Sequence, residues 1–144
     1  MGGAAMKVGD AMAKTISTAA PSDSVRRVAT LMREEGAGFL PVCDGDRLVG
    51  VITDRDIVIR CIAEGGADAL ELPIDRCMSR GVHTVSPDEE LEAAARMMER
   101  EEVRRLAVVE DGQLVGVLSH GNLVQAVQGG GPAQQATVGI TRGA

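Results

Sequence analysis

Hydrophobic residues recur along the chain with a helical period in two segments. The spacing i, i+3, i+4, i+7 predicts a helix with one buried face. It is found at Val25, Val28, Ala29 and Met32, and again at Leu91, Ala94, Ala95 and Met98. The run Ser86-Pro87-Asp88-Glu89 offers a capping residue, a first-turn proline and a glutamate at the capping-box position. The second helix is therefore predicted to start at Ser86, and the first at Ser22.

Each helical segment precedes a predicted β-hairpin, because two apolar runs of strand length flank a turn that contains Asp-Gly. The strand, turn and strand are residues 39–43, 44–46 and 47–52, and again residues 106–109, 110–112 and 113–118. A helical turn and a short strand lead into each half, at 8–12 and 15–18 and at 74–78 and 82–85. A final helix begins at Thr53 with Ile57, Val58 and Cys61, or at Ser119 with Leu123, Val124 and Val127.

The two halves are an internal repeat. Met78 repeats Met12, Pro87 repeats Pro21 and Gly116 repeats Gly50, each 66 positions later, without a gap. We expect an α/β fold with two units of the order β-α-β-β-α. Units of about 60 residues are marginal alone, so the two should pack together. We expect the repeats at 7–66 and 73–128, a linker at 64–72, and a disordered tail at 129–144.

Composition excludes several classes of function. Aromatic residues make up 1% of the chain, which leaves no stacking platform for single-stranded nucleic acid. The net charge of −6 gives no broad attraction for nucleic acid or an anionic membrane. The sequence has no run of roughly 18 apolar residues and no signal-peptide pattern, so we expect a cytoplasmic protein.

The cysteines and histidines suggest no chemistry. Cys43, Cys61 and Cys77 are odd in number and lack C-x-x-C spacing, which argues against a secreted disulfide framework. We expect buried or incidental thiols in a reducing cytosol. Together with His83 and His120 they could in principle form a metal site, but they show no metal-ligand spacing. No nucleophile has an evident base. We therefore expect neither a metal site nor an enzyme.

The most informative stretch is residues 48–56, a short apolar strand that leads directly into a helix. Gly50 interrupts the strand, which often marks close approach of another backbone or of a ligand. Thr53 stands at the N-cap position with Asp56 three residues on. A helix N-terminus presents unpaired N–H groups and can bind an anion. Residues 114–122 repeat this corner.

Together, the duplication and the two corners resemble tandem cystathionine-β-synthase (CBS) domains. The motif Gly-hydrophobic-x-Ser/Thr-x-x-Asp/Asn stands at 50–56 and at 116–122, and the resemblance covers residues 8–127. The chain is also similar to small stand-alone actinobacterial members of the hypoxic-response type. The resemblance implies two units about a pseudo-twofold axis, with AMP, ADP or ATP bound in clefts between them. It also implies a homodimer.

By this resemblance, Thr53 contacts a phosphate and Asp56 accepts hydrogen bonds from the ribose hydroxyls. The alternative is that the pair is only a helix cap, worth about 1 kcal/mol. Ser119 and Asn122 are the second copy, in which the amide lacks the charge that strengthens such bonds. His120 could touch a phosphate or simply lie at the surface.

The resemblance adds two further pairs of ligand-binding candidates. Arg104 and Arg105 would face the phosphates, because an arginine fork suits phosphate oxygens. They could instead be a solvated pair that balances neighbouring glutamates. Thr18 and Thr84 would contact the adenine edge, or serve as ordinary strand residues.

The resemblance implies a non-catalytic regulatory module for energy sensing, which needs no cofactor. It would bind an adenine nucleotide and signal to a protein partner in trans. The rival is a ligand-free dimerisation or interaction scaffold whose motifs serve as helix caps. Asn122 and Ala107 depart from the usual pattern and favour that rival slightly.

Overall fold

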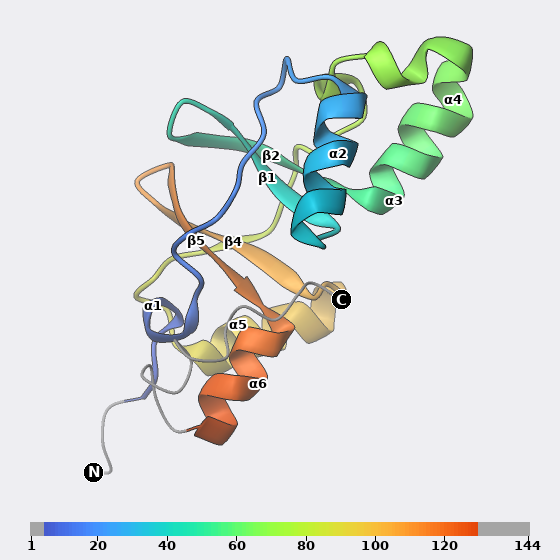
Figure 1. The fold of residues 1–144 in the computed structure, drawn as a ribbon. Helices are drawn as coiled ribbons and strands as arrows, with labels where there is room; N and C mark the ends of the chain where they lie inside the picture. Colours follow the sequence, from blue (N-terminus) through green and yellow to red (C-terminus); the bar gives the residue numbers. More distant parts are fainter. Residues whose placement is uncertain (1–4, 130–144) are drawn as a thin grey trace. The chain divides into compact units, whose positions relative to one another are not determined.

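The computed structural model describes residues 5–129 (Figure 1). These residues form two compact units, one of residues 17–82 and one of residues 5–16 with 83–129. The helical turn that leads into each half therefore belongs to the same unit as the helix and hairpin of the other half, whereas residues 83–85 stay with the second half. Of the predicted disordered tail at 129–144, all but Gly129 lies outside the described residues.

The unit of residues 17–82 is built on one helix and one hairpin. Leu40 faces Ile52 across the antiparallel pair, and a bulge falls between Val42 and Cys43. Both predicted strands and their turn are confirmed. The elements are α2 (Val25–Glu35), β1 (Phe39–Asp44), β2 (Arg47–Thr53), α3 (Asp54–Asp56), π-helix η1 (Ile57–Ile62), α4 (Ala63–Gly65), and the 3-10 helices η2 (Gly66–Glu71) and η3 (Ile74–Arg76).

The unit of residues 5–16 and 83–129 repeats this plan with a third strand. Its elements are α1 (Val8–Ala11), β3 (Thr84–Val85), α5 (Leu91–Glu101), β4 (Arg105–Glu110), β5 (Gln113–Ser119) and α6 (His120–Gly129). β4 pairs antiparallel with β5 and parallel with β3, and α5 packs beside α6 (Figure 1). The periodic apolar residues fill the core, as predicted, with Leu91, Ala94 and Met98 all buried.

Both predicted helix starts were wrong. The cap of α2 is Ser24, whose hydroxyl accepts a hydrogen bond from the Arg27 N–H at 3.0 Å. α5 begins at Leu91, after the segment that contains Ser86 and Glu89. The Ser86 N–H donates to the Glu89 carboxylate at 2.8 Å, so these residues form a separate turn before the helix.

The strand predicted at 15–18 is wrong, and the segment expected to link the repeats has regular structure of its own. Residues 15–18 form no strand, and only Ala19 pairs in parallel with Val42. The chain passes from one unit to the other at residues 16 and 17, and the flanking pairings, Ala13 with Val117 and Ala19 with Val42, are single bridges. The expected linker at 64–72 is largely helical, since η2 buries Ala69.

The motif glycines lie against a neighbouring backbone, as predicted for Gly50. A Cβ on Gly50 would lie 2.6 Å from the Ser79 carbonyl oxygen. A Cβ on Gly116 would lie 2.8 Å from the Ala13 carbonyl oxygen. Backbone hydrogen bonds cause this close approach at Gly50. The Val51 N–H donates to the Ser79 carbonyl at 2.9 Å, and the Ser79 N–H donates to the Val51 carbonyl at 2.8 Å.

The expectation of three thiols was wrong. Cys61 and Cys77 form a disulfide, with Cα atoms 5.7 Å apart and a sequence separation of 16. The Cα–Cα distance falls within the range that a disulfide spans. Cys43 is a buried free thiol, and burial, with a smaller contribution from Asp46, raises its pKa.

Residues 5–129 contain neither a membrane-spanning helix nor a cluster of metal ligands. No helix in this range has the length and apolar character needed to cross a membrane. No three or more His, Cys, Asp or Glu side chains within it are placed to hold a metal ion.

Candidate functional site

The corner between β2 and α3 is a complete capping box. The Thr53 hydroxyl accepts from the Asp56 N–H at 3.1 Å, and the Asp56 carboxylate accepts from the Thr53 N–H at 3.0 Å. The two side chains thus fix each other and the first turn of the helix. The Thr53 hydroxyl still has its own proton to donate, and each Asp56 oxygen has a second lone pair. The corner can therefore be a cap and offer groups to a ligand at once.

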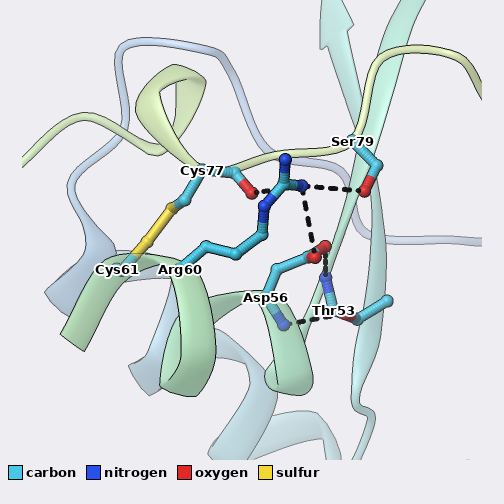
Figure 2. The surroundings of a disulfide bond; sticks show 6 residues. All are labelled: Thr53, Asp56, Arg60, Cys61, Cys77 and Ser79. Carbon is cyan, nitrogen blue, oxygen red and sulfur yellow. Dashed lines mark hydrogen bonds and ion pairs between the residues drawn. A yellow bond between two sulfur atoms is a disulfide. The ribbon is translucent and has the colours of Figure 1, made fainter. Parts of the chain in front are cut away.

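Asp56 is held from a second side by a cation. Its Oδ1 lies 3.6 Å from Nη1 of Arg60, one helical turn later (Figure 2). The Asp56 side chain is 14% exposed and that of Arg60 is 50% exposed, so the carboxylate is sheltered while the guanidinium reaches solvent. The sequence interpretation missed Arg60, although acid and base four apart on a helix is a recognisable pairing.

The corner between β5 and α6 repeats the cap with different chemistry. The Ser119 hydroxyl accepts from the Asn122 N–H at 2.9 Å, and the Asn122 side-chain oxygen accepts from the Ser119 N–H at 3.1 Å. Asn122 is 5% exposed, and among the described residues it is the one polar or charged residue that is buried. An amide therefore serves this cap as well as a carboxylate serves the other.

Three more predicted residues, Arg104, Arg105 and His120, lie at the Ser119 corner, and Thr84 lies on the same sheet. Arg105 opens β4 and faces Ser119 across the strand pair. The His120 N–H donates to the Arg104 carbonyl at 2.7 Å, while both side chains are exposed. Thr84 is exposed on β3 and pairs with Ala107 of β4, so it belongs to the same sheet.

The unit of residues 17–82 contains the remaining predicted residues. Thr53 and Asp56 lie together, with Phe39 opposite Thr53 on β1. Thr18 is exposed beside Ala19, which pairs with Val42, three positions along β1 from Phe39. Thr18 is therefore placed by the middle of the hairpin, apart from the corner.

Gly38, just before β1, contacts the first turn of α3. The Asp54 N–H donates to its carbonyl at 3.0 Å, and a Cβ on it would lie 2.5 Å from Oδ2 of Asp54. A side chain at position 38 would therefore require the exposed Asp54 carboxylate to move. The second half has Arg104 at the corresponding position, where the matching carbonyl accepts from His120.

Comparison with known proteins places the chain in a family. The model of the CBS domain matches residues 8–62 and 74–129. The chain belongs to the CBS domain family. The CBS domain-containing protein YhcV of Bacillus subtilis is 33% identical over 116 residues, which are 81% of each chain. Hypoxic response protein 1 of Mycobacterium tuberculosis is 32% identical over 121 residues, again 81% of each. The predicted family and the likeness to the hypoxic-response type are confirmed.

Solved structures of CBS proteins share the α/β fold, which is also confirmed. CBSX2, solved in complex with AMP, has a TM-score of 0.77 at 31% identity and covers 86% of this chain and 97% of its own. The CBS domain pair of MJ0100, solved with 5′-methylthioadenosine and S-adenosylmethionine, has a TM-score of 0.75 at 25% identity. It covers 88% of this chain and 99% of its own.

Proposed function

We propose that this CBS pair is a non-catalytic regulatory module that binds AMP, ADP or ATP at the Thr53–Asp56 corner. One observation carries the proposal: a sheltered carboxylate fixed at a helix N-terminus in a CBS fold. The carboxylate can accept from two ribose hydroxyls, and the helix N-terminus favours a phosphate. The AMP complex of CBSX2, at 31% identity over nearly its whole length, supports an adenosine ligand.

The remaining candidate residues have weaker support. We assign Arg104, Arg105 and His120 to phosphate contacts, and Thr18 and Thr84 to the adenine edge. Arg104, His120 and both threonines are exposed, as such contacts require. Ser119 and Asn122 would be a second, weaker site, because Asn122 is uncharged and buried.

The mechanism that we propose is differential binding. A nucleotide that binds one conformation of the protein better than another shifts the population toward it. A protein target in trans would then read the change. In this proposal the protein works in the cytoplasm as a homodimer.

A ligand-free scaffold is the second candidate, and one observation favours it. Both corners are complete hydrogen-bonded caps within the protein itself. A cap alone would account for the motif residues at both places.

Asp56→Asn separates these two functions. Asn122 shows that an amide can hold this cap, so the variant should fold normally while the corner loses its charge. Hydrogen bonds to charged groups are worth about 1 kcal/mol more than neutral ones, so nucleotide affinity should fall about fivefold. The matched control is Asp54→Asn, which removes the same charge from an exposed carboxylate two residues earlier.

The measurement is calorimetric titration with AMP, ADP, ATP and S-adenosylmethionine, with thermal unfolding alongside. A ligand at 100 times its dissociation constant should add about 2.7 kcal/mol to the free energy of unfolding. Binding that weakens in Asp56→Asn but stays within about twofold in Asp54→Asn would support the sensor. If the folded protein binds none of these nucleotides, the ligand-free scaffold is the function that remains.

A further inference from the structure

The disulfide begins on the helix that continues from the Thr53–Asp56 corner. Cys61 lies near the end of η1, the helix that continues from the corner, and Cys77 lies just after η3 (Figure 2). Each cysteine is 1% exposed, so the bond lies inside the core of its unit. The bond therefore ties the helix that leaves the corner to residues 77–79.

The same segment is tied to the strand that enters the corner. Ser79 exchanges two backbone hydrogen bonds with Val51 of β2, two residues before Thr53. Residues 77–79 thus connect both sides of the corner, one side through the backbone of Ser79 and the other through the sulfur of Cys77.

Arg60 joins this segment to the proposed ligand-binding carboxylate. Its Nη1 donates to the Cys77 carbonyl and to the Ser79 hydroxyl, both at 3.4 Å, and lies 3.6 Å from Oδ1 of Asp56. Figure 2 shows the guanidinium between the Asp56 carboxylate and these two acceptors. The disulfide holds in place the acceptors that orient Arg60, and Arg60 in turn faces Asp56. We call Arg60, Cys61, Cys77 and Ser79 the clasp.

The second half of the chain has the corner without the clasp. At the corresponding positions stand Ala126, Val127, Ala11 and Ala13. The cap of Ser119 and Asn122 and the backbone pairing of Ala13 with Val117 are nevertheless retained. The corner therefore forms without a disulfide or an arginine, and the clasp is an addition to the first corner alone.

We propose that Arg60 is a positioning residue for Asp56, and that the redox state of the Cys61–Cys77 pair controls how firmly Arg60 orients the Asp56 carboxylate. The proposal rests on the nucleotide site proposed above. With the disulfide formed, Arg60 fixes the charged carboxylate in one orientation before ligand arrives, which lowers the cost of binding. Reduction releases residues 77–79 from η1, loosens Arg60 and weakens nucleotide binding.

The reductant is a dithiol. One of its thiolates attacks a sulfur of the pair, the Cys61–Cys77 bond breaks, and the second thiolate closes the dithiol into a disulfide. Two electrons and two protons end on the Cys61 and Cys77 thiols. Both sulfurs are buried, so attack requires local opening of the end of η1. In a cytoplasmic protein a disulfide is usually transient and redox-sensing, which agrees with this role.

The ligand arm of the test compares AMP affinity by calorimetry before and after reduction with dithiothreitol. The Arg60–Asp56 ion pair is half exposed, and such pairs contribute little free energy. Its loss on reduction should therefore weaken AMP binding only about two- to fivefold. Arg60→Gln should weaken AMP binding of the oxidised protein by a similar factor and make it insensitive to reduction. Arg60→Lys should restore part of the affinity. Arg27→Gln, which removes another exposed arginine paired four residues away in the same unit, is the control.

The ligand-free arm follows backbone amide exchange at Thr53 and Asp56, whose N–H groups the cap protects. Reduction should speed their exchange more than that of the Ser119 and Asn122 amides, which lack a clasp. Equal changes at the two corners, or a redox effect on AMP that persists in Arg60→Gln, would overturn the proposal. If AMP and its relatives bind neither redox state, the nucleotide site fails, and the exchange rates alone decide whether the clasp acts on the corner.

Discussion

At the scale of single residues, the two motif glycines have a steric role that their sequence context only suggested. Each sits where two backbones exchange hydrogen bonds beside a corner, so the space for a side chain is already filled. The strand therefore cannot accept even a methyl group without moving its partner segment.

Gly50→Ala should destabilise the protein by about 1–3 kcal/mol, the usual range for an added methyl group in a packed site. The reason is the 2.6 Å approach to the Ser79 carbonyl, which is backbone and cannot rotate away. Urea unfolding measures the loss. Gly81→Ala is the control, because no atom lies within 4 Å of the added Cβ there. Equal stability of the two variants would contradict the steric account.

At the scale of elements, the helix starts show the limit of what local sequence can predict. Ser22, Ser24 and Ser86 are all plausible caps by residue type, but only Ser24 caps the helix that follows it. The hairpins, by contrast, were predicted nearly to the residue, because Asp-Gly turns and alternating burial act over a few neighbours.

Ser24→Ala should cost about 1 kcal/mol of unfolding free energy, the typical value for loss of an N-cap hydroxyl. Ser22→Ala should change it by less than about 0.5 kcal/mol, as for an ordinary surface substitution. Both are measured by chemical denaturation under the same conditions. A larger loss in Ser22→Ala would restore the start predicted from sequence.

In the candidate site too, the residues that depend on local sequence were predicted and those that depend on a distant segment were not. The Thr53–Asp56 and Ser119–Asn122 pairs were found from sequence because each cap spans only three residues. Arg60 could have been found, since its partner is one helical turn away. The part played by Cys77 and Ser79 could not, because it depends on a segment some 20 positions distant that returns to β2.

At the scale of the whole molecule, the duplication gave the fold but not the division into units. Residues 5–16 belong with 83–129, so the compact units are not the two sequence repeats. Local patterns carry no information on such an exchange. The disulfide is likewise a tertiary feature, since two cysteines 16 apart show no recognisable spacing.

Reduction of Cys61–Cys77 should lower the free energy of unfolding by about 3 kcal/mol, as estimated for a closed loop of this length. Urea titrations with and without dithiothreitol measure the difference. Alkylation of the unfolded protein counts the free thiols and so verifies the redox state of the disulfide. One thiol, Cys43, should react before reduction, and all three cysteines should react after it. An unchanged midpoint after full reduction would argue against a stabilising bond.

The wide turn of η1 has a consequence for which residue of each helix faces its core. In α6 the inward side chain is Ala126, and Val127 is 65% exposed, whereas η1 turns Cys61 inward and leaves Arg60 outside. The inward position thus comes seven residues after Ser119 but eight after Thr53. A π-helical turn accommodates one extra residue without breaking the helix. The first helix therefore turns inward one position later than the ungapped match of the two halves would place it. As a result Cys61 enters the core of its unit, and Arg60, which matches the buried Ala126, reaches solvent beside Asp56.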